Sequence, residues 1–138
     1  MDFTQENVVS VWLGAGVPEA SFAALLELRP EATADGEFPP SQFAEDFGIA
    51  WYDHDFLEAC FEADNRPIAT LLDGVSFGAS FVEVVAELAL RAGLPAANAA
   101  ALLYDVSYVL DPDLVAASGP LRFVGAIPYE PTDIPNER

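Results

Sequence analysis

The sequence contains no lysine, one cysteine (Cys60) and one histidine (His54). Without lysine it has neither a Gly-Lys-Ser/Thr phosphate-binding loop nor a Schiff-base lysine. One His and one Cys are too few for a His-Glu-x-x-His pair or for a zinc site built from Cys and His. These absences exclude several common catalytic and metal sites, and we expect no catalytic residues, no bound metal and no cofactor.

Cys60 and His54 remain a conceivable nucleophile and base, since a nearby imidazole can activate a thiol. On a single strand, however, their six-residue offset would separate them by about 20 Å at ~3.3 Å per residue. We therefore expect Cys60 to be a small core residue and His54 to be a solvated surface residue. A lone cysteine also excludes an intrachain disulfide, which favours a reducing compartment.

Positive charge is scarce: 5 arginines face 23 Asp and Glu residues, for a net charge of −18. Nucleic acids and anionic membranes are bound largely through Lys and Arg, so neither is expected as a partner. Two interpretations of the acidic surface stay open, namely a basic protein partner and a role in solubility alone.

Long apolar runs are also missing, and the first residues, MDFTQENVV, lack a basic signal-peptide region. We expect a soluble, cytoplasmic protein without an export signal. With 138 residues, 52% of them hydrophobic, residues 1–138 are expected to form a single domain with a sizeable core.

The first half of the chain predicts strands and helices in turn. A β-branched strand is expected at residues 7–13, with Trp12 facing away from Val11 and Leu13, followed by a helix that opens at Pro18. Ser41 is a suitable cap for a short helix that ends at Gly48. Residues 57–62 alternate as a half-buried strand would, although Asp55 and Glu58 also resemble a capping box that would begin a helix.

The second half predicts two helices and then two strands. Asp64-Asn65 is expected to cap a brief helix through residue 72, and Ser80 with Glu83 forms a capping box for a longer one that ends at Gly93. Strands are expected at residues 102–109 and 121–127, the second with a bulge at Gly125, and pairing with each other. Residues 128–138 are expected to be a frayed tail. The order of elements predicts an α+β fold with helices packed on a mostly antiparallel sheet.

Residues 41–62 interleave aromatic and acidic side chains more densely than any other stretch. We expect a partner to bind there, with the tryptophan and tyrosine as apolar anchors, through Asp46, Trp51, Tyr52, Asp53, Asp55 and Glu58. The same carboxylates leave other interpretations open: a Ca²⁺ or Mg²⁺ site, a solvated acidic face, or a hydrolytic carboxylate pair.

Three blocks resemble the bacterial immunity protein 22 family, whose members are antidotes in polymorphic toxin systems. They are VSVWLG at residues 9–14, SQFAEDFGIAWYDHDF at residues 41–56 and GPLRFVGAIPY at residues 119–129. The most specific pattern comprises Phe43, Asp46, Phe47, Gly48, Tyr52, Asp53, Asp55 and Phe56. The alanine-rich run at residues 96–101 departs from the longer polar side chains expected of relatives.

The resemblance implies an α+β fold and a protein that binds and blocks a cognate secreted toxin domain without catalysis. Many such toxins are nucleases with basic phosphate-binding surfaces, towards which an acidic inhibitor would be steered. Two alternatives are a small acidic hydrolase that uses the carboxylates near Asp53 and a non-catalytic regulatory subunit.

Overall fold

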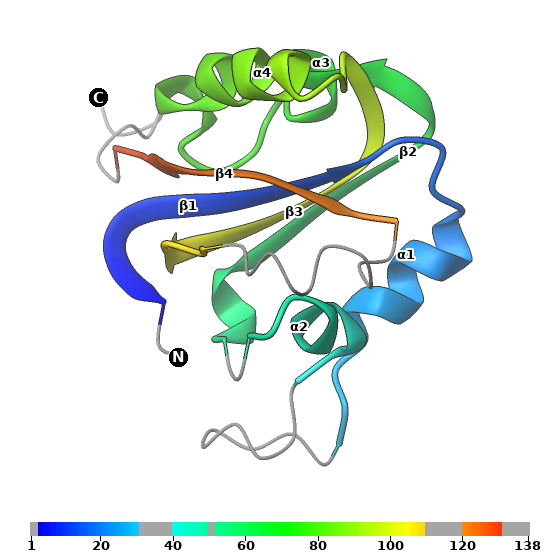
Figure 1. Cartoon of the computed structure of the whole chain (residues 1–138), viewed down its shortest axis with the longest axis vertical. Helices are drawn as coiled ribbons and strands as arrows, with labels where there is room; N and C mark the ends of the chain where they lie inside the picture. Colours follow the sequence, from blue (N-terminus) through cyan, green and yellow to red (C-terminus); the bar gives the residue numbers. More distant parts are fainter. Residues whose placement is uncertain (1–2, 31–39, 50–51, 110–119, 131–138) are drawn as a thin grey trace.

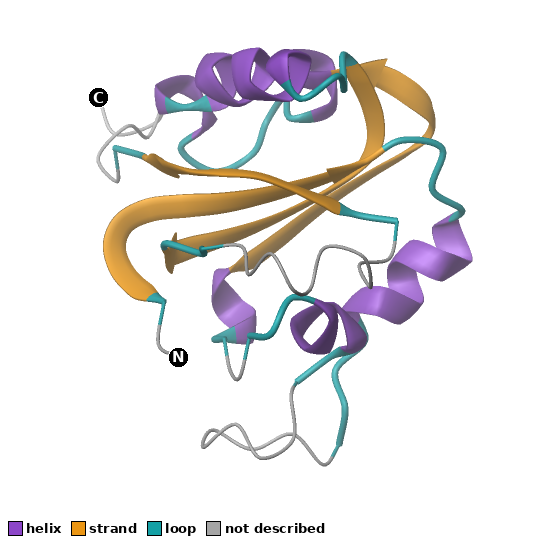
Figure 2. Cartoon of the chain, in the orientation of Figure 1, coloured by secondary structure: helices purple, strands orange, loops and turns teal. Residues whose placement is uncertain are grey.

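A computed structural model describes residues 3–30, 40–49, 52–109 and 120–130. In chain order the elements are β1 (Thr4–Gly14), α1 (Glu19–Leu26), α2 (Gln42–Asp46), the 3₁₀ turn η1 (His54–Phe56), β2 (Leu57–Pro67), α3 (Ile68–Leu71), the 3₁₀ turn η2 (Gly78–Ser80), α4 (Val82–Arg91), β3 (Ala96–Val106) and β4 (Arg122–Pro128). The strands form one antiparallel sheet, and the predicted α+β class is confirmed (Figure 2).

The strand order is β2-β3-β1-β4, so the predicted pairing of β3 with β4 is wrong. The first strand lies between them and is antiparallel to both. From Val8 to Gly14 every residue of β1 is buried, because its side chains are apolar or small on both faces. A strand that is apolar on both faces is most stable in the middle of a covered sheet.

Helices cover both faces of this sheet (Figure 1). One core cluster joins the sheet to α3 and α4 and includes Val9, Val11 and Leu13. The other joins it to α1 and α2 and includes Trp12. The predicted placement of Trp12 on the opposite face from Val11 and Leu13 is therefore confirmed.

The alanine-rich run forms the first half of β3, in the interior of the sheet. Ala101 pairs with Trp12 across the strands, and Ala100 pairs with Leu13 on one side and Cys60 on the other. Small side chains beside large ones let the two layers of side chains interdigitate. The run that seemed unusual in the sequence is thus a packing requirement of a sheet covered on both faces.

The local signals for element ends were right in some places and wrong in others. Ser41 caps α2 as predicted. Its Oγ accepts a hydrogen bond from the Ala44 N–H at 3.1 Å. The strand prediction for residues 57–62 is confirmed, and η1 precedes it. The Asp64-Asn65 cap is wrong, because β2 continues through both residues to Pro67.

The capping box of Ser80 and Glu83 is also wrong, although the helix itself is present. The Ser80 hydroxyl instead donates to the carbonyl of Phe77 at 2.7 Å and accepts from the N–H of Glu130 at 3.0 Å. In β4, the register shifts opposite Val11 and Trp12, which confirms a bulge beside Gly125.

The predicted frayed tail is wrong at its start, since Pro128 ends β4 and Tyr129 is buried; residues 131–138 lie outside the described part. Across the described ranges, none of the helices is both long and apolar enough to cross a membrane.

Candidate functional site

Two adjoining hollows lie at one end of the sheet, where β1 and β2 begin and β3 and β4 end (left in Figure 1). The larger hollow has a volume of about 460 Å³ and the smaller hollow about 320 Å³. Phe56 and Asp105 line both. We call the two hollows together the acidic end, because the carboxylates that line them are Glu6, Asp53, Asp55, Glu58 and Asp105.

Glu58, near the start of β2, is held in place by two neighbouring segments. Its Oε1 accepts hydrogen bonds from the Tyr104 hydroxyl at 2.8 Å and from the Ser76 N–H at 3.1 Å. Burial, and then the hydrogen bond to Glu58, raise the pKa of Tyr104 far above its usual range. The hydroxyl therefore stays protonated, and its one proton lies between two acceptors at 2.8 Å, Glu58 Oε1 and the carbonyl of Ser76.

Asp105, near the end of β3, is held in the same manner. Its Oδ1 accepts from the Tyr129 hydroxyl at 2.7 Å and from the Asn7 N–H at 2.9 Å. Burial, together with the hydrogen bond to Asp105, raises the pKa of Tyr129 to about 12. Two carboxylates from different strands thus face one hollow in fixed positions.

The backbone around the larger hollow is unusual. Among the described residues other than glycine, only Asn7, Phe77 and Asp105 have positive φ, at 63°, 59° and 60°. Asn and Asp tolerate this conformation, whereas a bulky residue such as Phe rarely adopts it. Phe77 and Asp105 line the larger hollow, and Asn7 contacts it through Asp105. Strained residues that cluster in this way are typical of functional sites.

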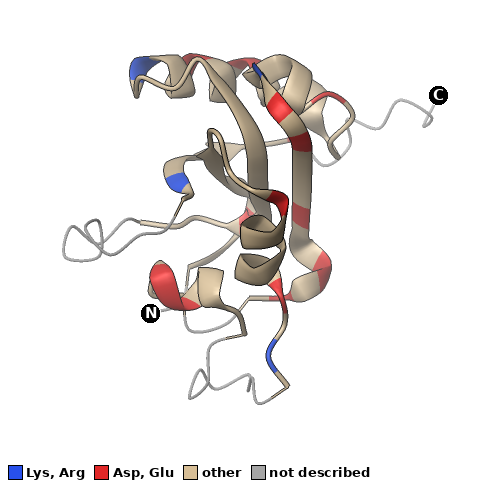
Figure 3. Cartoon of the chain, turned by 90° about the vertical axis from the view of Figure 1, so that its right-hand side faces the viewer, with Lys and Arg blue, Asp and Glu red and all other residues tan. Residues whose placement is uncertain are grey.

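The acidic end has no compensating positive charge in the described part of the chain. The ion pairs among the described residues join Arg29 to Glu45, Arg66 to Glu62 and Arg91 to Glu87. Arg122 donates instead to the carbonyl of Ala92 at 3.0 Å. In Figure 3, acidic positions recur from η1 along β2, while basic positions are few and scattered.

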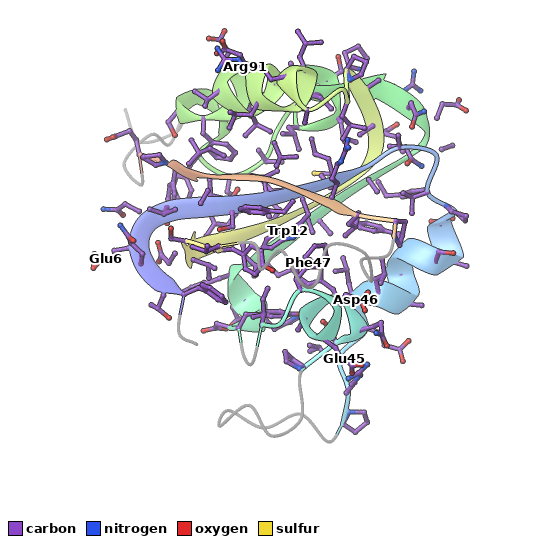
Figure 4. The ribbon with its side chains drawn as sticks, viewed as in Figure 1. Glu6, Trp12, Glu45, Asp46, Phe47 and Arg91 are labelled. Atoms are coloured by element: carbon purple, nitrogen blue, oxygen red, sulfur yellow. The ribbon has the colours of Figure 1, made fainter. Side chains whose placement is uncertain are left out.

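Three of the predicted partner-binding residues come together at this end. Asp55 and Glu58 line the larger hollow, and Asp53 lines the smaller one, where its side chain caps η1 by accepting from the Asp55 N–H at 2.9 Å. Asp46 lies elsewhere, on α2, where it accepts a hydrogen bond from Gln42. Figure 4 shows Asp46 well separated from Glu6, which marks the acidic end. Trp51 is outside the described residues.

Tyr52 is not the exposed anchor that the sequence predicts, because only 3% of it is exposed. Its hydroxyl is hydrogen-bonded to Ser41 at 3.1 Å, and its ring packs edge-on against Phe43. Burial raises the pKa of its phenol. Among the described Phe, Tyr and Trp residues of this segment, the exposed one is Phe56, at 43%.

The sequence did not identify Asp105 and Tyr129 as residues of this site. Asp105 stood in an alternating strand pattern and Tyr129 in an expected tail, so no local signal linked either residue to Glu58. Phe56 was visible as one aromatic residue of the acidic stretch, but nothing in the sequence distinguished it from the aromatic residues that are buried.

The surroundings of Cys60 and His54 do not suit a catalytic nucleophile and its base. His54 is exposed in η1, whereas Cys60 is half-buried in β2 and packs against the core. Burial, and then the charges of Glu58 and Glu62, raise the pKa of the Cys60 thiol to about 11, which is the opposite of thiol activation. Among the residues that the structure describes, no group of three or more His, Cys, Asp or Glu side chains is placed to hold a metal ion.

A family model described as Immunity protein 22 matches residues 9–130. Its span takes in all four strands except the first residues of β1, and both hollows fall largely within it. No curated protein and no solved structure matches the chain.

Proposed function

The chain belongs to the immunity protein 22 family, and from this premise we propose that it binds a cognate secreted toxin domain in the cytoplasm and neutralises it by occupancy, without catalysing a reaction. The proposed docking site is the acidic end, with Asp53, Asp55 and Glu58 as charged contacts and Phe56 as the apolar anchor. Asp46, which lies apart on α2, is not included.

The observation that carries this proposal is the uncompensated negative charge around an exposed aromatic residue. Phe56 lies between carboxylates that no arginine of the described chain neutralises. Such a surface attracts a basic partner and accelerates association. A nuclease fits this description, because its phosphate-binding surface is basic and would attract an acidic inhibitor.

A double variant, Asp53→Asn with Asp55→Lys, tests the docking site. Asparagine keeps the cap on η1, since it caps as well as aspartate, while the lysine reverses an exposed charge. We expect slower association with the cognate toxin domain, a weaker dependence of the association rate on salt, and loss of protection in cells that produce the toxin. Stopped-flow binding at several salt concentrations and a growth assay measure these effects.

The matched control is Glu83→Gln with Glu87→Lys on α4, which changes the net charge by the same amount at exposed positions. The proposed docking site is wrong if the control abolishes protection while the Asp53 and Asp55 variant binds as wild type does, with both variants folded. Hydrolysis of a phosphoester by the purified protein, lost in Asp53→Asn, would contradict the non-catalytic part of the proposal.

A further inference from the structure

The larger hollow is lined by aromatic and acidic side chains and is large enough to admit a small group from outside. Its volume of about 460 Å³ lies in the range of about 300–1,000 Å³ that is typical of ligand sites. Four aromatic residues line it, namely Phe56, Phe77, Tyr104 and Tyr129. The rings of Phe77 and Tyr129 lie 5.3 Å apart at 30°, and Tyr104 meets Tyr129 edge-on at the same distance. These contacts make a rigid aromatic wall.

Two carboxylates of this hollow have acceptor capacity that the described residues do not use. Glu58 Oε2 has only a long 3.4 Å contact with the Ser76 N–H, and Asp105 Oδ2 accepts no hydrogen bond from the described residues. Their other oxygens are held by Tyr104 and Tyr129. Because both carboxylates are already oriented, a donor from outside would bind them at little entropic cost.

An aromatic wall beside two oriented carboxylates suits a guanidinium better than an ammonium. A guanidinium is planar, stacks on aromatic faces, donates several hydrogen bonds in a fixed fork and is weakly hydrated. A lysine ammonium lacks the plane and loses more hydration on burial. The four described arginines of this chain are engaged elsewhere, so none of the guanidinium groups that the structure describes occupies the hollow.

We propose that the larger hollow receives one arginine side chain of the toxin, with its guanidinium against the aromatic wall and its N–H groups donating to Glu58 and Asp105. The identity of the partner rests on the proposed function, whereas recognition of arginine rests on the hollow alone. Asp55, exposed at the rim, would guide the approaching charge.

The test uses the whole protein and three small probes: the N-acetyl amides of arginine, lysine and citrulline. Citrulline has the shape of arginine without its charge. Titrations followed by amide chemical shifts should show arginine perturbing Phe56, Phe77 and Asp105, with lysine weaker and citrulline without effect. Glu58→Gln and Asp105→Asn should each weaken arginine binding about tenfold.

Both substitutions remove a charge but keep an amide oxygen where the tyrosine hydroxyl and backbone N–H donate, and asparagine tolerates the positive φ of position 105. Their melting curves should therefore stay close to wild type. The control, Glu83→Gln with Glu87→Gln, should bind arginine as wild type does. Equal perturbation by arginine and citrulline, lysine binding as tightly as arginine, or shifts mapping outside the hollow would each overturn the inference.

The two proposals can fail separately. If the Asp53 and Asp55 variant loses protection but arginine does not enter the hollow, the docking function stands and the arginine receptor is wrong. If arginine binds as described while that variant protects fully, the receptor stands and the proposed docking function is wrong.

Discussion

Trp12 is the largest of the described core side chains and is fully buried. Its ring contacts Phe43, Phe47, Tyr108 and Phe123, with ring centroids 4.8–5.7 Å apart, between the sheet and α2 (Figure 4). Its Nε1 has no hydrogen-bond partner among the described residues. An unpaired buried N–H costs about 1–3 kcal/mol, which the burial of the indole and its ring contacts must exceed.

Trp12→Ala should lower the free energy of unfolding by about 3–5 kcal/mol, because it removes a large aromatic ring from a packed core. Trp12→Phe should cost clearly less, since it keeps a ring and removes the unpaired N–H. Urea denaturation measures both changes. Protection in cells should fall in step with stability. A Trp12→Ala protein as stable as wild type that no longer protects would instead place Trp12 at the interface.

Asn98, on β3, is one of the few buried polar side chains, at 2% exposure. Its Oδ1 accepts from the N–H of Val17 at 2.9 Å, and its Nδ2 donates to the carbonyls of Val17 at 2.8 Å and Glu62 at 3.1 Å. The side chain therefore joins three elements: β3, the β1–α1 turn and β2. It satisfies backbone groups that the turn and the irregular pairing of β2 leave without partners.

Asn98→Ala should destabilise the protein by about 2–4 kcal/mol, because it leaves buried backbone donors and acceptors unpaired. Asn65→Ala is the matched control. Asn65 accepts from the neighbouring Gly16 N–H at 2.9 Å, but at an exposed site, where water can replace it, so its loss should cost less than about 1 kcal/mol. Urea denaturation of both variants checks the difference. Equal costs would show that the buried bridge at Asn98 is not needed.

Few kinds of side chain in this sequence titrate in the alkaline range. With no lysine, the side chains whose ordinary pKa lies between about 8.5 and 12 are one cysteine and four tyrosines. Burial raises the pKa of Cys60 to about 11 and of Tyr129 to about 12, and it also raises that of Tyr52 and Tyr104. The folded protein thus retains protons that the unfolded chain releases.

These groups should therefore leave the free energy of unfolding unchanged below about pH 8.5. The free energy of unfolding should fall as the pH rises from there to about 12. The sign follows because the unfolded state binds fewer protons than the folded state in this range. Free energies of unfolding at several pH values measure the decline. Cys60→Ala should reduce the slope in the lower part of the range, and Tyr129→Phe should reduce it above about pH 10. A flat profile up to pH 12 would contradict the burial of these groups.

Patterns confined to a few neighbouring residues predicted much of this molecule. The alternation of Val11, Trp12 and Leu13 assigned each to the correct face, because successive side chains of a strand point in opposite directions. Ser41 was identified as a cap, and the bulge beside Gly125 was identified from one glycine within a strand. The family was recognised from short blocks. The acidic stretch also predicted Asp53, Asp55 and Glu58 as binding residues, and their role in binding stays a prediction.

Strand order, the burial of Tyr52 and the composition of the larger hollow depended on contacts between distant parts of the chain. Asp105 and Asn7, which are 98 positions apart, meet only because β1 enters the sheet beside β3. Tyr129 reaches Asp105 only because β4 pairs with β1. A local pattern records whether a side chain prefers water or the core, but it does not record which distant side chain will lie beside it. That choice is made when the sheet and its two helical layers bury their apolar faces together.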